Sequence, residues 1–298
     1  MREAARGDLP PDIGPGLIGV AAAPPIPRLQ IGTPDPIRAH VSPGTVLQQW
    51  LDNDGRLIAT GGRSGDTWWM RWQALATFWF SDSGAVRAEP VRNGLELELR
   101  DSFMRGVIPV VLLARGYEAL HASAILVPQG VVALCGTSGT GKSTTALAIA
   151  AQGAAHYSDD TVVYQVIDGR VVAARLPFPV RVDAAAREVV GSPGRMRFGQ
   201  PPAPPDTTPL HRIYHLVRDG SVAVDAPHFV SIAPARRFEV LLAHSHPFDM
   251  GGDNRRRAFI EHLMAVARTV DVWECRFAPS LADLPALAGA IRRHAETA

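Results

Sequence analysis

The sequence has 298 residues, of which 46% are hydrophobic and 20% are charged. This composition is typical of a folded protein with one large domain or two ordinary ones. Its 30 basic and 29 acidic residues leave a net charge of +1, which does not suggest the concentrated basic face that nucleic-acid binding normally needs, so we expect no nucleic-acid partner. Since the longest apolar stretch covers only residues 107–114, we expect no membrane partner and a cytoplasmic location.

The first part of the chain predicts a β-rich region. Residues 1–37 are rich in Pro, Gly and Ala and are expected to form an irregular lead-in. Residues 38–118 contain short β-like runs separated by Asp-Gly, Ser-Gly and Asn-Gly turn dipeptides, which predict an antiparallel meander. A helix capped by Asp101 or Ser102 and kinked at Pro109 is expected to end this region.

A glycine-rich loop follows two apolar strands expected at residues 120–127 and 131–135, and it precedes a helix expected at residues 144–152. The loop matches the pattern G-x-x-x-x-G-K-[ST] of a P-loop, or Walker A motif, in the strand and helix context that this pattern requires. The sequence therefore predicts a nucleotide-binding site. The residues expected to bind the nucleotide are Gly136, Thr137, Ser138, Gly139, Thr140, Gly141, Lys142, Ser143 and Thr144.

The spacing within this loop has a chemical purpose. The glycines let successive backbone N–H groups converge on phosphate oxygens, and the following helix points its positive end at them. Lys142, the only lysine in the chain, is expected to contact the β- and γ-phosphates, and Ser143 is expected to bind Mg²⁺. Because an arginine fork is too wide for that pocket, a lysine is needed here even in an arginine-rich chain.

Two neighbouring carboxylates, Asp159 and Asp160, follow the short strand expected at residues 154–157. Strand ends on this side of an open α/β sheet form the ligand crevice. One aspartate could hold Mg²⁺, and the other could accept the proton of an attacking hydroxyl group. The alternative is a solvated turn, which we favour less for two carboxylates beside a P-loop.

Between residues 120 and 163 the sequence resembles the HPr kinase/phosphorylase-like serine kinases. The resemblance rests on four features in order: the run His121-Ala122-Ser123-Ala124, the P-loop, an Ala/Leu-rich helix ending at Gly153, and the run Ser158-Asp159-Asp160. It implies an α/β fold in which residues 119–298 form a P-loop kinase core related to PEP carboxykinase, with a mixed sheet and flanking helices. The β-rich N-terminal region precedes this core.

The resemblance also implies an activity, namely the use of ATP and Mg²⁺ to phosphorylate a serine on a small protein or peptide. In that family the aspartate pair supplies the base and a metal contact. The implied catalytic residues are Asp159, Asp160, Lys142 and His121, and the implied metal ligands are Ser143 and Asp159. Stand-alone members are often associated with the maturation of ribosomally made peptides, including lasso peptides, which implies a peptide substrate.

Some alternatives stay open. The chain has Thr137 and Thr144 where bifunctional members usually carry Asp and Glu, so a phosphorylase activity is undecided. A second hypothesis is a non-catalytic nucleotide-binding sensor or assembly module that uses the meander as its partner surface. A small-molecule kinase is a third. Homo-oligomer formation is also left open.

Two further clusters are interpreted as surface features. His244 and His246 lie in a turn, where a His-x-His pair is more often exposed than metal-binding. Three arginines, Arg255, Arg256 and Arg257, begin a predicted helix, and a solvated face is favoured over a phosphate contact.

Overall fold

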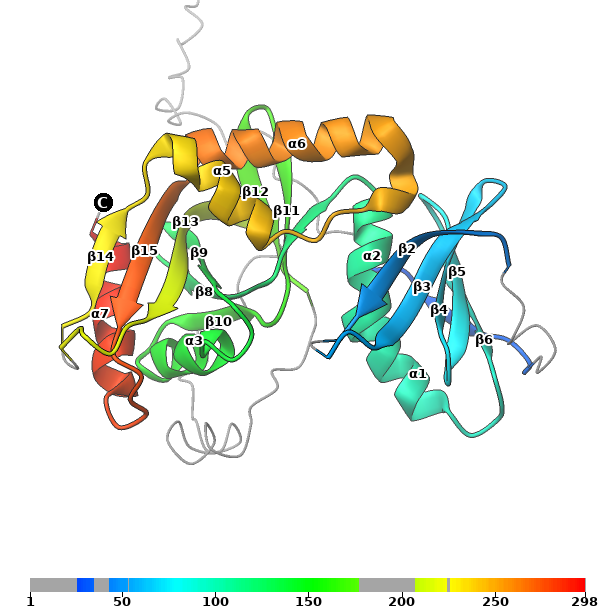
Figure 1. Cartoon of the computed structure of the whole chain (residues 1–298), viewed down its shortest axis with the longest axis horizontal. Helices are drawn as coiled ribbons and strands as arrows, with labels where there is room; N and C mark the ends of the chain where they lie inside the picture. The colour runs from blue at the N-terminus through cyan, green and yellow to red at the C-terminus, as the bar shows by residue number, and fades with distance from the viewer. Residues whose placement is uncertain (1–25, 35–42, 53, 177–206, 224–225, 298) are drawn as a thin grey trace, which may run out of the picture.

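The computed structural model describes residues 26–34, 43–52, 54–176, 207–223 and 226–297 (Figure 1). Within these residues the strands form two sheets, one of six strands and one of nine. Helices flank both sheets, so the chain has a mixed α/β fold (Figure 1).

The first sheet is antiparallel from its second strand to its sixth, and these strands follow one another in chain order. Its first strand lies in the stretch expected to be irregular, and it pairs in parallel with the sixth. The lead-in prediction is therefore wrong at this strand, and residues 1–25 lie outside the described residues. The six strands are β1 (Leu29–Ile31), β2 (Thr45–Leu51), β3 (Leu57–Ser64), β4 (Thr67–Trp72), β5 (Ala76–Phe80) and β6 (Val86–Pro90).

One helical segment packs on this sheet, and its core joins strand residues such as Phe78 to helix residues such as Val107. The segment runs from α1 (Glu96–Ser102) through a π-helical turn, η2 (Phe103–Val107), into α2 (Ile108–Ala114). The predicted start is wrong, because Asp101 and Ser102 end α1 and do not cap it. Pro109 lies in the first turn of α2, directly after the π-helical turn, where the regular α-helical hydrogen-bond pattern is already interrupted.

The second sheet is mixed. Its central strand, β13, pairs in parallel with β9 and β15 and antiparallel with β12. β7 at one end of the described order pairs with β11, so this sheet begins at residue 118. The division into domains at residues 118 and 119 stays a prediction. The nine strands are β7 (Glu118–Leu120), β8 (Ala122–Val127), β9 (Gly130–Cys135), β10 (Ala155–Ser158), β11 (Val162–Ile167), β12 (Arg170–Ala174), β13 (Thr207–Arg218), β14 (His228–Ser231) and β15 (Asp271–Phe277).

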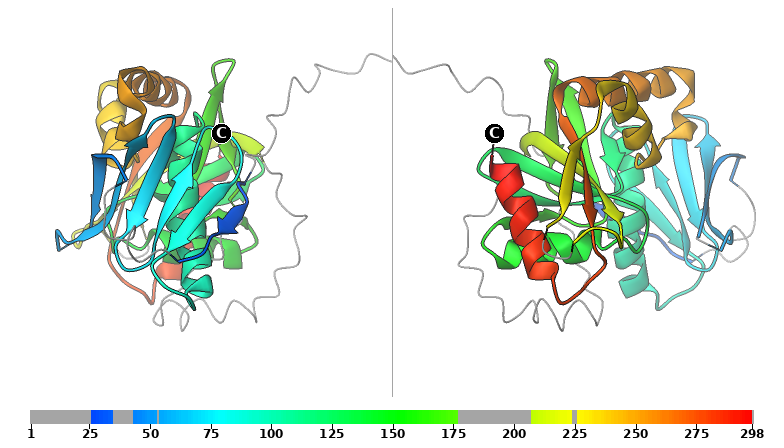
Figure 2. Two further views of the ribbon diagram at one scale, coloured as in Figure 1. Left: turned by 90° about the vertical axis from the view of Figure 1, so that its right-hand side faces the viewer. Right: turned by 60° about the vertical axis from the view of Figure 1, so that its left-hand side comes forward.

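Helices cover both faces of the second sheet (Figure 2). On one face, α3 (Lys142–Ala151) and α7 (Leu284–Glu296) share a core with Val132 and Leu134 of β9. On the other face, α5 (Pro234–Ala243) and α6 (Gly252–Thr269) share a core with Ala133. Successive side chains of β9 therefore enter opposite layers, as strand geometry requires. A short 3₁₀ turn, η3 (Asp249–Gly251), precedes α6. None of the helices within the described ranges is long and apolar enough to cross a membrane.

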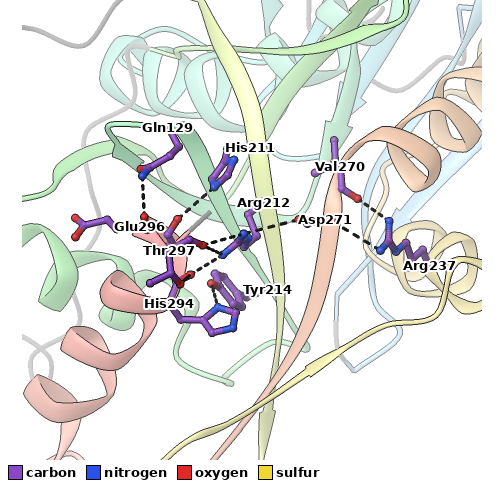
Figure 3. Close-up of polar contacts among 11 residues, drawn as sticks. Gln129, His211, Arg212, Tyr214, Arg237, Val270, Asp271, His294, Glu296 and Thr297 are labelled. Carbon is purple, nitrogen blue, oxygen red and sulfur yellow. Dashed lines mark hydrogen bonds and ion pairs between the residues drawn. The ribbon is translucent and has the colours of Figure 1, made fainter.

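A polar network ties the end of α7 to β13 (Figure 3). The buried Arg212 donates to the carbonyl oxygen of His294 at 2.5 Å, and the hydroxyl of Tyr214 lies 2.6 Å from Nδ1 of the same histidine. At its other end α7 accepts a hydrogen bond from the Gln152 side chain at the carbonyl of Pro285. These contacts hold α7 in place against α3, and α3 is the helix that directly follows the glycine-rich loop.

Candidate active site

The glycine-rich loop leaves the end of β9 and opens α3, as the sequence predicts. Gly139 and Gly141 have φ angles of 77° and 104°, in the left-handed region that a side chain disfavours. Gly141 is the residue directly before α3, so this turn places the free N–H groups of the first helical turn beside the loop. The loop therefore has the backbone geometry of an anion-binding helix N-terminus.

Lys142 is the first residue of α3, directly after the loop, and is 7% exposed. Its Nζ donates to the carbonyl oxygens of Gly136 at 3.0 Å and Thr137 at 3.3 Å. Burial lowers the pKa of Lys142, and the nearby carboxylates of Asp159 and Asp160 act in the opposite direction. The ammonium is thus held by neutral carbonyl groups at the point where a phosphate would approach.

A row of three oxygen-bearing side chains lies next to the loop. Ser143 Oγ, on α3, is 3.2 Å from Ser123 Oγ, on β8. Ser123 in turn donates to Oδ1 of Asp159 at 3.0 Å, and Asp159 is 3% exposed. β10 pairs with β8, which brings the segment after β10 against Ser123. Asp159 is therefore a buried carboxylate in fixed relation to Ser143 at the start of α3.

Asp160 faces the other way, and its side chain is 61% exposed. Its φ of 65° lies in the left-handed region, which is uncommon for a residue other than glycine. Such a conformation costs on the order of 1–3 kcal/mol and is concentrated at functional sites. Oδ1 of Asp160 lies 3.5 Å from Nδ1 of His121, so the residue that joins β7 to β8 contacts this carboxylate. The four residues predicted to be catalytic are brought together.

The histidines of the turn at residues 244–246 lie beside this site, so their interpretation as surface residues is wrong. His121 donates its backbone N–H to the carbonyl of His244 at 2.7 Å, and its ring packs edge-on against His246 at 5.8 Å. Burial and then the neighbouring His215 and Lys142 lower the pKa of His244 to about 4. Burial and the charge of Lys142 also lower the pKa of His121, while the carboxylate of Asp160 acts in the opposite direction.

A first cavity of about 610 Å³ opens beside the loop. Its polar side contains the predicted residues from Ser138 to Thr144, together with His121 and Asp160. The opposite side is apolar and is formed by Phe277, Pro279, Leu281, Leu284 and Leu287. Arg218 lies on the rim, where its Nε donates to the carbonyl of Thr140 at 3.2 Å. Sequence reasoning missed the apolar wall and Arg218, which no local motif marks.

Two more cavities continue from the first one toward the N-terminal sheet. One, of about 480 Å³, is lined by Ser143, Asp159 and Asp160 on one side and by residues of α1, η2 and β4 on the other. The next, of about 550 Å³, lies between β2, α2 and the turn at residues 246–249. Trp72, Arg105 and Gly106 line both. Asp160 lines all three cavities and therefore marks their junction.

The donor set beside the loop is suited to Mg²⁺. No group of three or more His, Cys, Asp and Glu side chains in the described part of the chain is placed to hold a metal ion. Mg²⁺ bound together with a nucleotide needs no such cage, since phosphates and waters supply most of its ligands. The carboxylate of Asp159 and the hydroxyl of Ser143 are hard oxygen ligands, joined through Ser123. These residues fit the ion.

Comparisons with known proteins add little. No family model matches the sequence, and no curated protein matches it. Among solved structures, the chain is similar to the Hpr(Ser) kinase/phosphatase from Coxiella burnetii, with 15% identity, a TM-score of 0.32, and coverage of 59% of this chain and 95% of that one. A likeness at this level carries no argument about activity, so the assignment to a family rests on the motif resemblance and stays a prediction.

Proposed function

We propose that the chain is a kinase that transfers the γ-phosphoryl group of ATP to a serine hydroxyl on a peptide or small protein. The position of Asp160 carries this proposal, because one carboxylate lies at the junction between the loop cavity and the two cavities beyond it. A kinase needs such a group between its phosphate donor and its acceptor.

The donor end is formed by the loop and the first cavity. The N–H groups at the start of α3 and the ammonium of Lys142 face the space where the β- and γ-phosphates would bind. The apolar wall at Phe277 and Leu281 gives the nucleoside a surface for packing. Ser143 and Asp159 would hold Mg²⁺, which supplies charge neutralisation on the phosphate oxygens.

The acceptor step needs a base, and we assign this role to Asp160, whose exposed carboxylate lines all three cavities. Asp160 accepts the proton of the acceptor hydroxyl as the hydroxyl oxygen forms a bond to the γ-phosphorus. The bond between that phosphorus and the β–γ bridging oxygen breaks, and ADP leaves with the electron pair. Asp159 is less suited to this role because it is buried and already accepts a hydrogen bond from Ser123. His121 acts as a positioning residue that restrains Asp160.

The test compares two aspartates that share a left-handed backbone conformation. Asp160 and Asp168 both have a positive φ, and Asp168 lies in the turn between β11 and β12. Asparagine tolerates this conformation, so Asp160→Asn and Asp168→Asn should both fold. Transfer of labelled phosphate from ATP to a library of serine peptides should fall about 10²- to 10⁴-fold in Asp160→Asn and stay unchanged in Asp168→Asn.

The two alternative functions predict different results in the same assay. ATP binding without phosphorylation of any peptide or metabolite contradicts the kinase proposal and favours a nucleotide-binding sensor or assembly module. Phosphorylation of metabolites but not peptides favours a small-molecule kinase. Full activity in Asp160→Asn contradicts the role given to this carboxylate.

A further inference from the structure

The third cavity is bounded by the edge of the N-terminal sheet. In the described sheet, β2 pairs with β3 on one side only and ends the strand order. Its residues 47–51 all line the cavity, which therefore runs along the strand edge. We call this cavity, bounded by β2, α2 and residues 246–249, the β2 groove.

The exposed surface of β2 is unusual for a sheet edge. Three of its apolar side chains, Val46, Leu47 and Leu51, are 43%, 45% and 56% exposed. Natural edge strands are normally protected by charged residues, by Pro or by a covering element, because a free edge pairs with other chains. The sequence of β2, TVLQQWL, contains neither Pro nor a charged residue. An edge of this kind is suited to a partner strand.

The groove supplies an apolar floor next to that edge. Trp72 and Met70 of β4 and Pro109, Val110 and Leu113 of the helical segment line it. Gln48 crosses to the turn on the far side, where its Nε2 donates to the carbonyl of Pro247 at 3.1 Å. The cavity of about 550 Å³ falls in the size range of ligand pockets. It offers burial to large apolar side chains.

The groove also ends at the proposed catalytic base. Asp160 and Thr161 form part of its lining, and Trp72, Arg105 and Gly106 continue from it into the cavity that contains Ser143 and Asp159. A chain lying along β2 would therefore lead toward the carboxylate at which the phosphoryl group would be transferred.

We infer that the acceptor is an extended peptide segment that adds to the edge of β2 left unpaired in the described sheet, buries an apolar side chain in the β2 groove and presents its serine to Asp160. The backbone edge gives an extended peptide its main-chain partners, while the pocket selects a side chain. Because the β2 groove is continuous with the cavity beside the glycine-rich loop, a peptide bound in the groove is positioned to accept the phosphoryl group. This inference rests on the proposed kinase function.

The test uses short synthetic peptides, each with a central serine and one leucine placed in turn at every other position, in a background of alanine and glycine. Hydrogen exchange reports docking without any need for transfer. Peptides with leucine at the correct spacing should slow exchange in residues 45–51 and should be phosphorylated with a KM about tenfold lower than the leucine-free peptide.

A matched pair of variants localises the effect. Leu47→Arg places a charge in the groove, whereas Leu97→Arg changes a leucine on α1 that is 81% exposed and lines none of the three cavities described above. Circular dichroism checks that both fold. Leu47→Arg should raise the KM for the leucine peptide about tenfold, and Leu97→Arg should leave it unchanged.

Each outcome decides a different point. Peptide phosphorylation without slower exchange in β2, or an unchanged KM in Leu47→Arg, overturns the docking inference but leaves the kinase function intact. Phosphorylation of small hydroxyl compounds alone overturns the inference as well. Slower exchange in β2 with no phosphorylation of any acceptor supports docking and overturns the kinase function on which the acceptor role depends.

Discussion

Ser123 donates a hydrogen bond to the buried carboxylate of Asp159 across 3.0 Å. The same hydroxyl lies 3.2 Å from that of Ser143 in the first turn of α3. A buried carboxylate left without this partner would lose part of its orientation, and groups that orient metal ligands are often worth 10- to 100-fold in affinity. The serine on β8 is therefore placed to set the distance between the two residues that would hold Mg²⁺.

Replacing Ser123 by alanine tests this relationship. We expect Ser123→Ala to weaken Mg²⁺ binding, with the Mg²⁺ concentration for half-maximal transfer rising about 10- to 100-fold, because Asp159 and Ser143 lose their common partner. Titration of Mg²⁺ at saturating ATP measures the effect. Ser81→Ala, at an exposed hydroxyl bonded to the carbonyl of Ser83, is the control. An unchanged Mg²⁺ titration in Ser123→Ala would show that this hydroxyl has no such role.

Gly106 packs directly against Trp72. A Cβ atom at this position would lie 2.4 Å from Cζ2 of the indole, so Gly106→Ala must displace a side chain that lines both acceptor-side cavities. We expect a loss of about 1–3 kcal/mol in unfolding free energy and a raised KM for the peptide acceptor. Denaturant unfolding and steady-state kinetics measure the two effects.

Gly289→Ala is the matched control for Gly106→Ala. Its Cβ would meet the ends of two flexible side chains, Arg293 and Gln152, at 3.2 Å. It should leave the KM of the acceptor unchanged. An equal change of KM in both variants would mean that displacement of Trp72 is not the cause.

Glu118 is fully buried and holds α6 to the start of the second sheet. Arg255 donates to its two carboxylate oxygens at 2.7 and 2.8 Å, and Nδ1 of His262 lies 2.7 Å from Oε1. Because Arg255→Ala leaves a buried charge without its main partner, it should reduce the unfolding free energy by about 3–5 kcal/mol. Arg256→Ala, at the exposed neighbour, should change it by less than about 0.5 kcal/mol. Urea unfolding curves compare the two, and equal midpoints would contradict the account.

His244 predicts a loss of stability in acid. Its pKa of about 4 lies below the ordinary value of 6.5, so the unfolded chain binds the proton more readily than the folded one. The loss of unfolding free energy caused by protonation of His244 is absent above pH 6.5. It grows as the pH falls toward 4 and reaches about 3 kcal/mol. His244→Gln should therefore lose less stability than the wild type over this interval. Unfolding curves at a series of pH values measure the difference, and parallel profiles would contradict it.

The glycine-rich loop could be predicted because its geometry is local. All the residues that form it are adjacent in sequence, and the strand before it and the helix after it follow from apolar runs and glycine positions. The aspartate pair was also predicted, since it directly follows a strand of the same sheet. The sequence could not show that Asp159 is buried while Asp160 is exposed, because this difference depends on the pairing of β10 with β8.

The residues that sequence reasoning missed come from distant segments. Arg105 and Trp72 reach the site only because the N-terminal sheet and its helical segment lie against the second sheet. Arg255 was assigned to a solvated face, yet its partner Glu118 is 137 positions away. The start of the helical segment was misplaced for a related reason, since Asp101 and Ser102 are common cap residues but here lie at the end of α1. Tertiary contacts decided these cases.

The most direct test of the central claim is phosphoryl transfer from labelled ATP to peptide by the wild type and by Lys142→Arg, with folding checked by circular dichroism. The Nζ of Lys142 lies within 3.3 Å of two loop carbonyls and is buried, and we expect the wider, planar guanidinium of arginine to fit poorly between these carbonyls and a phosphate. The account predicts transfer by the wild type and at least about a hundredfold loss in Lys142→Arg, although the net charge is unchanged. Equal transfer by both proteins would contradict it.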